Sequence, residues 1–333
     1  MRQMSLASNG SIIFKKYMLK KTSIIIGILI FIGLIIWSGN YYKNSRLVAK
    51  SGAIGAKLKV VTTLFPLYDQ AKNIGGAQAD VYQLLPPGVE AHSFEPKPSD
   101  IVRINEADIF IYTGKFMEPW VEDILHSVSN PNLIVVDASQ GTKMIPGVFH
   151  DADEPAGSLD PHIWLDFDNA KIMASNINQA FIKKDSPNQT VYQLATDAYV
   201  NQLTQLDEKY RTALANCQSK KIIYGGHYAF GYLANRYGLE YFAAQGIAPD
   251  AEPTAADLIA LVKQLKTEKI KYIFYEELSS PKIAQTIASE SSAQMLLLNA
   301  AHNLSKEQFD SAWSFLEILE NNLANLKIGL GCK

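Results

Sequence analysis

Four histidines are the residues best suited to chemistry in this sequence, because a neutral imidazole nitrogen is a strong ligand for a metal ion such as zinc. They are His92, His162, His227 and His302, and they lie far apart in the chain. No HExxH, CxxC or short His-x-His pattern is present, and a single histidine is more often a surface or hydrogen-bonded residue than a ligand. The four could therefore form a site only in a folded cleft.

The segments around these histidines favour such a cleft. Each histidine lies in a loop, after a strand-like or turn segment and before a helix-like one. His92, for example, follows residues 79–85 and a Pro-Pro-Gly turn, and His302 follows residues 294–298. Because open α/β sheets place their ligand crevice at loops of this kind, the placement favours a common metal site.

The rest of the sequence alternates β-rich and helix-periodic segments. The predicted strands cover residues 57–63, 79–85, 108–113, 133–136, 221–224, 240–242, 271–275 and 294–298. The predicted helices cover residues 68–74, 101–107, 118–128, 169–182, 188–214, 228–237, 254–265, 281–289 and 305–326. Ser99 or Asp100 is expected to cap the second helix, Thr254 the seventh and Ser305 the last. The alternation predicts an α/β fold with largely parallel sheets.

The longest predicted helix divides the chain into two α/β lobes. About 27 residues at 1.5 Å each span about 40 Å, which is longer than one small domain needs, so we interpret this helix as a connector. The predicted parts are a cytoplasmic N-terminal segment (1–22), a transmembrane anchor or signal segment (23–42), a tether (43–56), an N-terminal α/β lobe (57–187), the connecting helix (188–216) and a C-terminal α/β lobe (217–333).

The segment over 23–42 begins with an uncharged apolar run, preceded by several lysines over residues 15–21. Flanking lysines favour a cytoplasmic N-terminus, so the globular part is expected outside the cytoplasmic membrane. No small-x-small cleavage site directly follows the run, and no cysteine follows it for lipid attachment. We therefore favour a retained anchor over a cleaved signal, although a start at Met18 would give an ordinary export signal.

Composition limits the partners. The 333 residues, 47% of them hydrophobic and 19% charged, are enough for two globular domains. The net charge of −2 offers no basic surface for nucleic acid. The two cysteines, Cys217 and Cys332, form either one disulfide or two free thiols, and the sequence leaves both open.

Four motifs together resemble the metal-binding solute-receptor family of ABC transporters, in its zinc-type (ZnuA-like) branch. They are GVEAHSFEPKPSD (88–100), DPHIWLD (160–166), HYAFGYLANRYGL (227–239) and GIAPDAEPT (246–254). The resemblance runs from about residue 57 to residue 326. It implies two lobes joined by one long helix, a metal ion held in the cleft between the lobes, and docking of the loaded receptor on a membrane permease. We expect a monomer.

The resemblance also implies a ligand set. His92 and His162 would bind the metal from the first lobe and His227 from the second, and a histidine rather than a carboxylate at position 227 favours Zn²⁺ over Mn²⁺. Family members usually supply a carboxylate as fourth ligand after the last strand. Here His302 is the first choice, water the second, and Asn299 is a poor zinc ligand.

Other polar residues near the motifs are less well supported as part of the metal site. The loop with His150, Asp151, Asp153 and Glu154 resembles a reduced form of the His/acid-rich loop of zinc-type members, and we interpret it as a solvated loop. Three further residues could orient ligands by hydrogen bonds or serve in capping and packing. They are Glu95, Asp166 and Tyr228.

The function expected from these features is capture of Zn²⁺ outside the cytoplasm and its delivery to an ABC permease, without catalysis. A manganese or iron receptor of the same family is the close alternative. A zinc hydrolase would need a carboxylate base beside the histidines, and the sequence shows none in a known arrangement. An adhesin-like module suits a surface-anchored chain, but no sequence feature indicates its ligand.

Overall fold

The computed structural model describes residues 56–147, 158–247, 253–278 and 280–333. The predicted segments 1–22 and 23–42, the tether up to residue 55 and the loop with His150 lie outside the described residues. In the described part of the chain, no helix is long and apolar enough to cross a bilayer.

The first lobe is built on a parallel sheet in the order β2-β1-β3-β4. Its strands are β1 (Leu58–Thr62), β2 (Ala79–Gln83), β3 (Ile109–Tyr112) and β4 (Ile134–Asp137). Its helices are α2 (Phe65–Gly75), α3 (Pro98–Asn105), α4 (Val121–Ser127) and α5 (Phe167–Lys184), with short 3₁₀ turns η1 (Gly76–Gln78) and η2 (Ile163–Leu165). The central strand β3 is almost wholly buried, as expected for a parallel sheet that is covered on both faces.

The second lobe repeats this arrangement, with a parallel sheet in the order β6-β5-β7-β8. Its strands are β5 (Lys221–Tyr224), β6 (Glu240–Ala243), β7 (Tyr272–Tyr275) and β8 (Gln294–Leu297). Its helices are α7 (Gly231–Tyr237), α8 (Ala255–Glu268), α9 (Lys282–Ser291), α10 (Lys306–Asp310) and α11 (Phe315–Leu330). The predicted α/β fold with two lobes is confirmed.

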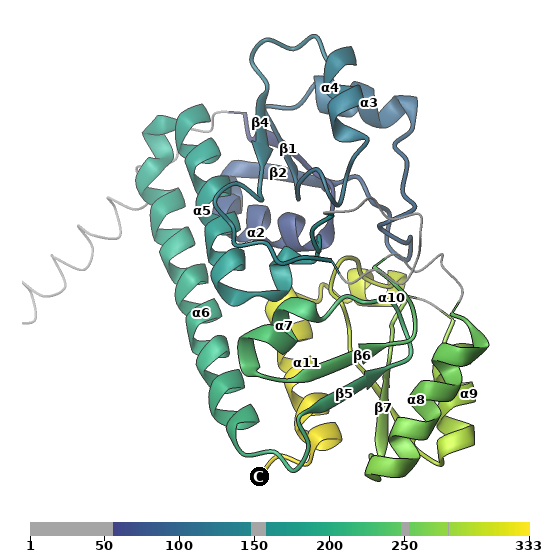
Figure 1. Cartoon of the computed structure of the whole chain (residues 1–333). Helices are drawn as coiled ribbons and strands as arrows, with labels where there is room; N and C mark the ends of the chain where they lie inside the picture. The colour runs from purple at the N-terminus through teal and green to yellow at the C-terminus, as the bar shows by residue number, and fades with distance from the viewer. Residues whose placement is uncertain (1–55, 148–157, 248–252, 279) are drawn as a thin grey trace, which may run out of the picture. The chain divides into compact units, whose positions relative to one another are not determined.

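A 27-residue helix, α6 (Gln189–Ala215), joins the lobes after the 3₁₀ turn η3 (Ser186–Asn188) and runs beside both of them (Figure 1). In its first half, the hydroxyl of Tyr199 donates to Asp69 of α2 at 3.0 Å. In its second half, the hydroxyl of Tyr210 donates to the carbonyl of Leu319 in α11 at 2.5 Å. The helix is therefore anchored on each lobe by a buried tyrosine.

Direct contacts between the lobes supplement α6. The guanidinium of Arg236 in α7 lies 3.0 Å from Asp166, the residue before α5. The indole N–H of Trp164 in η2 donates to the carbonyl of Ala300, which follows β8, at 2.8 Å. Both contacts join first-lobe residues near His162 to the second lobe, so the cleft is closed around that histidine.

The predicted helix over 305–326 is divided in the structure, and α3 begins earlier than predicted. The predicted helix over 305–326 is two helices: Ser305 caps α10, and Ser314 accepts from the backbone N–H of Glu317 to start α11. A second capping box inside the segment thus begins a new helix. Helix α3 begins after Lys97 with proline at its first position, which suits that position because proline has no N–H to satisfy.

The structure joins Cys217, which follows α6, to Cys332, which follows α11. The two cysteines are 115 residues apart in sequence. They also pair as an isolated antiparallel bridge, which closes the second lobe at the end of β5 away from His227. Of the two alternatives left open by the sequence, the structure contains the disulfide.

Reduction of this disulfide should lower stability without weakening metal binding. The chain-entropy relation gives about 5 kcal/mol for a loop of this length, and measured values are typically about 2–4 kcal/mol. We expect a Cys217→Ser, Cys332→Ser double variant to lose a free energy of unfolding in this range in urea titrations. Equal unfolding midpoints for the oxidised and reduced protein would contradict this stabilising role.

Candidate metal centre

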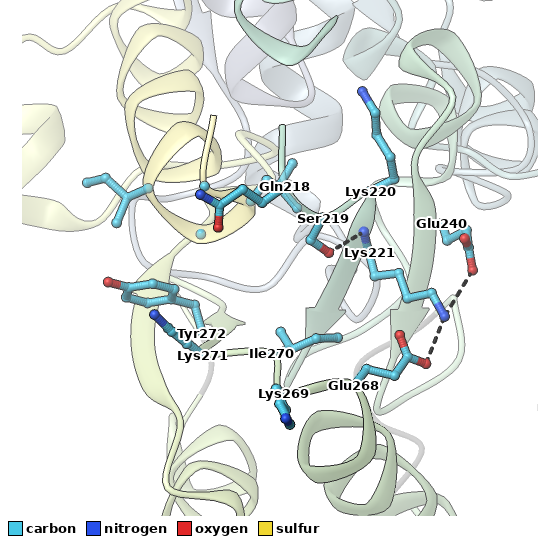
Figure 2. Close-up of a pocket in the computed structure, with 14 residues that line it drawn as sticks. Gln218, Ser219, Lys220, Lys221, Glu240, Glu268, Lys269, Ile270, Lys271 and Tyr272 are labelled. Atoms are coloured by element: carbon cyan, nitrogen blue, oxygen red, sulfur yellow. Dashed lines mark hydrogen bonds and ion pairs between the residues drawn. The ribbon is translucent and has the colours of Figure 1, made fainter. Parts of the chain in front are cut away.

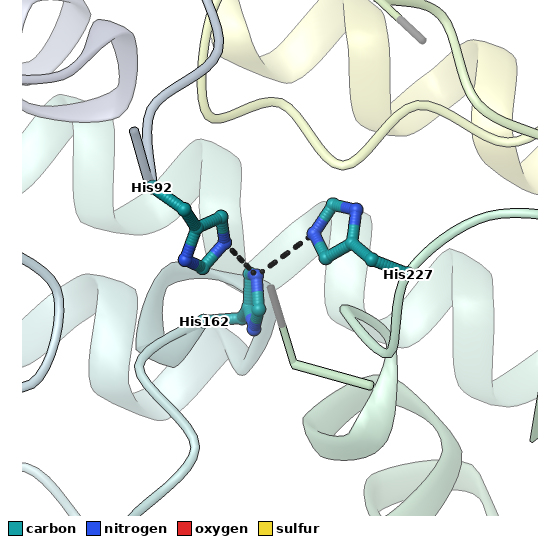
Figure 3. A group of neighbouring side chains, drawn as sticks. All are labelled: His92, His162 and His227. Carbon is teal, nitrogen blue, oxygen red and sulfur yellow. Dashed lines mark hydrogen bonds between the residues drawn. The ribbon is translucent and has the colours of Figure 1, made fainter. Parts of the chain in front are cut away.

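Three of the four predicted histidines converge at one point (Figure 3). The Nε2 atom of His162 lies 3.2 Å from Nε2 of His92 and 3.1 Å from Nε2 of His227. One ligand atom from each of the three lies within 4.8 Å of the other two. His162 and His227 are fully buried, and His92 is partly exposed. First-lobe and second-lobe residues thus share one centre.

The spacing of these nitrogens fits a zinc ion. At a bond length of about 2.0–2.1 Å, two ligands at neighbouring corners of a tetrahedron are about 3.3–3.4 Å apart. Carboxylates set the tautomers: Nδ1 of His162 lies 2.8 Å from Asp160, and Nδ1 of His227 lies 2.6 Å from Glu276. When each Nδ1 carries the proton that faces its carboxylate, each Nε2 presents a lone pair to the centre. In these tautomers the lone pairs face one another, an arrangement that suits a cation between them.

Strand order places the second-lobe part of this centre. His227 follows β5 and Glu276 follows β7, and these strands are neighbours at the point where the strand order of the sheet reverses. Ligand crevices in open α/β sheets lie at such points. Gly226 permits the close approach, because a Cβ there would lie 2.7 Å from Oε2 of Glu276.

First-lobe loops supply the other two histidines. His92 is reached through the turn after β2, where Gly88 has a φ of +83°, a left-handed conformation that glycine adopts without strain. His162 precedes η2, and its backbone N–H donates to Asp160 at 2.9 Å. Asp160 therefore orients both the backbone and the imidazole of His162.

His302 lies beside the centre, in the loop after β8. Its side chain is fully buried, and its ring centroid is 5.8 Å from that of His227 and 6.5 Å from that of His92. The structure groups its ligand nitrogen with carboxylate oxygens of Glu90 and Glu276, all within 4.8 Å of one another. Neither ring nitrogen has a hydrogen-bond partner among the described residues. The role of His302 as a ligand stays a prediction.

Carboxylates surround His302 and set its charge. Burial lowers its pKa, but Glu90, Glu277 and Glu276 outweigh burial and raise the pKa to about 9. Burial opposes ionisation of Glu90 as well, yet contact with His302 holds the pKa of that carboxyl well below its ordinary value. In the metal-free protein at neutral pH, His302 is therefore an imidazolium beside a carboxylate, at an Nε2–Oε2 distance of 3.4 Å.

The carboxylates at the centre were not identified from sequence, although signals for them existed. Asp160 is two residues before His162, and Glu276 and Glu277 directly follow a predicted strand, the position favoured for ligand contacts. Glu90 lies two residues before His92. Each was inside or beside a recognised segment, but which carboxylates face the histidines depends on strand order.

The residues that the sequence suggested as orienting groups have other positions. Asp166 caps α5 by accepting from the backbone N–H groups of Asp168 and Asn169. Glu95 is exposed. Tyr228 packs its ring against Tyr241, with centroids 4.7 Å apart. Of the alternatives stated for these residues, capping describes the contacts of Asp166 and packing those of Tyr228.

A second hollow, of about 570 Å³, lies at the amino ends of β5 and β7, away from His227 (Figure 2). Its lining includes several lysines, and the two acidic side chains among its lining residues both contact Lys221: Glu240 at 3.5 Å and Glu268 at 2.8 Å. It contains no histidine or cysteine. Both of its acidic side chains are paired with Lys221, and its lining has no histidine or cysteine ligand. It is therefore poorly suited to a metal ion.

Zinc binding should release about one proton near pH 7.5. His302 has a pKa of about 9 in the metal-free protein, so an ion that binds its nitrogen must displace a proton. Affinity should rise about tenfold for each pH unit up to pH 9 and then level off. His92 and His162 have pKa values well below 6.5, because burial favours their neutral forms, and add no proton release at this pH.

This release can be measured by calorimetry in buffers of different ionisation enthalpy. A His302→Gln variant should release about one proton fewer than the parent. Equal proton release by parent and variant would show that His302 does not exchange a proton for the ion.

The chain is similar to proteins of known function. The family model described as zinc-uptake complex component A, periplasmic (ZnuA) matches residues 60–329. The high-affinity zinc uptake system protein of Bacillus subtilis is 36% identical over 294 residues, which are 86% of this chain and 92% of that protein. Zinc-binding protein AdcA of Streptococcus pyogenes is 32% identical over 296 residues, which cover 84% of this chain but 57% of the relative.

A solved structure shows the same fold with zinc bound. The Zn(II)-bound ZnuA-like domain of Streptococcus pneumoniae AdcA has a TM-score of 0.72 and 31% sequence identity to this chain. The match covers 83% of this chain and 99% of that domain. The likeness thus extends over both lobes and the connecting helix.

Proposed function

The chain belongs to the ZnuA family of zinc-uptake components, and we propose that it captures Zn²⁺ outside the cytoplasm and hands it to the permease of an ABC transporter. Like the other members of its family, it is a solute-binding receptor and not an enzyme. The ion is cargo: the chain's task is to hold it tightly and release it to the next component. The high-affinity zinc uptake protein of Bacillus subtilis is its relative in this role.

The observation that carries this proposal is the convergence of three imidazoles across the lobes: Nε2 of His162 lies 3.2 Å from that of His92 and 3.1 Å from that of His227, and carboxylates lie behind His162 and His227. Nitrogen donors suit zinc, whereas manganese prefers carboxylate and water ligands. The ligands from the two lobes would close on one ion. A manganese or iron receptor is less well supported, because the inner donors are imidazoles.

The proposed ligands are His92, His162, His227 and His302. The first three are supported by their converging nitrogens. His302 is supported by its burial and by two ring nitrogens without a hydrogen-bond partner among the described residues. Four imidazoles leave the double charge of the ion uncompensated, so the buried carboxylates at the centre would supply the balance. Water is the alternative fourth ligand.

The proposed domain organisation keeps the boundaries expected from sequence. Residues 57–187 and 217–333 would form the lobes, with 188–216 as the connecting helix. Residues 1–22 would stay in the cytoplasm, 23–42 would anchor the chain in the cytoplasmic membrane, and 43–56 would tether a monomeric receptor near its permease. Periplasmic and extracellular receptors are the general class, and the lysine-flanked apolar run supports the anchor.

Metal content tests the function directly. Protein purified without chelators should retain about one zinc per chain, and excess Mn²⁺ should not displace it. A His227→Ala variant prepared in parallel should contain little zinc. If the parent contains no zinc and binds none in a calorimetric titration, while binding manganese, the chain is a manganese receptor.

A further inference from the structure

The turn over residues 86–90 forms the most exposed wall of the metal centre. Of the four histidines, only His92, two residues beyond this turn, is partly exposed, whereas the other three are fully buried. Val89 in the turn is 37% exposed. An ion leaving the centre would therefore pass more easily on the side of His92 than on the side of the buried histidines.

This first-lobe turn is tied to the second lobe by Asn303, a fully buried residue next to His302. The Nδ2 atom of Asn303 donates to the carbonyl of Pro86 at 2.7 Å and to that of Val89 at 2.8 Å. Its Oδ1 accepts from the side chain of Gln83 at 2.9 Å and from the backbone N–H of Leu304 at 2.9 Å. Every hydrogen-bonding position of the amide is used, and three of the four bonds reach the first lobe.

Two further contacts continue this link to His92. The backbone N–H of Gly88 donates to the carbonyl of Leu304 at 2.7 Å, so the turn is held at a second point. Oε1 of Glu90 accepts from the backbone N–H groups of Ala91 and His92 at 2.8 and 3.2 Å. An ordered turn therefore fixes the backbone that carries His92.

We propose that Asn303 is a positioning residue that latches the turn over 86–90 onto the second lobe, and thereby holds His92 at the ion and limits the rate at which zinc leaves. This inference rests on the proposed function, since it concerns release of the captured ion. The latch is present without an ion, so the loop does not have to be ordered when zinc binds. Its loss should act mainly on dissociation, as most changes to a binding site do.

Two variants of Asn303 test the latch. Asn303→Ala removes all four hydrogen bonds, and Asn303→Asp keeps the size of the side chain but places an oxygen against the carbonyls of Pro86 and Val89. Zinc dissociation, followed by stopped flow into excess of a chelating dye, should be at least tenfold faster in both. Hydrogen exchange of the backbone over 86–92 in the metal-free protein should also be faster.

Asn322→Ala is the matched control. Asn322 is 2% exposed, donates to the carbonyl of Asn299 at 2.7 Å and accepts from its N–H at 2.9 Å, so it supports the same second-lobe loop. Both of these bonds stay within the second lobe. This variant should lose stability, yet release zinc within about threefold of the parent rate and leave exchange over 86–92 unchanged.

The possible results separate the two proposals. A parent that does not bind zinc refutes the proposed function, whatever the variants do. A parent that binds zinc, with Asn303 variants that release it at the parent rate, refutes the latch alone. Equal acceleration by Asn303→Ala and Asn322→Ala also refutes it, because general loosening of the His302 loop would then be the cause.

If neither Asn303 variant folds, slow exchange of the Gly88 amide in the metal-free parent is the expected result, and fast exchange overturns the latch.

Discussion

Replacing His162 by alanine is expected to raise the zinc Kd by roughly 10²–10³. Its Nε2 is the nitrogen that lies within 3.2 Å of both His92 and His227. Zinc sites with four protein ligands bind with about 10–16 kcal/mol, so one ligand contributes about 2.5–4 kcal/mol, and each 1.4 kcal/mol is tenfold in Kd. The variant should also lose folding stability, because it leaves the buried carboxylate of Asp160 without its imidazole partner.

Competition with a chelator of known affinity measures this change. His126→Ala is the control, because His126 is an exposed histidine on α4, and its Kd should equal that of the parent. The zinc Kd of Asp160→Asn should lie between those of His162→Ala and His126→Ala, about 10- to 100-fold above the parent value. This variant keeps the ligand His162 but removes the carboxylate that orients it. Parent-like affinity in His162→Ala would mean that the three converging histidines do not hold the ion.

A further large effect is expected at His302. His302→Ala should raise the zinc Kd by roughly 10- to 100-fold and leave the fold intact, because a water molecule can take the vacated position. His302→Glu should recover part of the affinity and shift preference toward Mn²⁺, because carboxylate oxygen suits that ion better than imidazole does. The centre would then contain one more carboxylate beside Glu90, Glu276 and Glu277.

Calorimetric titration of zinc and manganese into the parent and these variants measures both effects. Thermal unfolding of the metal-free proteins should give midpoints within a few degrees of one another, which separates loss of binding from loss of fold. His227→Ala is the positive control for a damaged centre. If His302→Ala binds zinc as tightly as the parent while His227→Ala does not, His302 is a bystander and water or another side chain is the fourth ligand.

Much of the fold could be predicted from local pattern. Strand β5 spans Lys221–Tyr224, as predicted, and Thr254 caps α8 through its box with Asp257. Period-two and helical patterns, caps and turns are properties of neighbouring residues, so they can be read without knowing the tertiary contacts. The terminal helix was predicted as one because its hydrophobic pattern continues, while the second start at Ser314 depends on a single hydroxyl.

The candidate site likewise has parts that could be predicted from the sequence and parts that could not. The four histidines and their places in loops could be identified from the sequence, because imidazole chemistry and strand ends are local features. The partners could not: Glu276 reaches His227 because β5 and β7 are neighbours, and Glu90 reaches His302 because the two lobes meet there.

By itself, the sequence determined the donor type, the alternating fold and the long connector, since each depends on residue chemistry or on periodicity within one segment. Tertiary structure alone decided which carboxylates set the charge at the centre. It also decided that Asn303 joins the lobes and that Cys217 meets Cys332. The physical reason is the same in each case: these are contacts between different segments of the chain, whose formation depends on strand order and lobe packing.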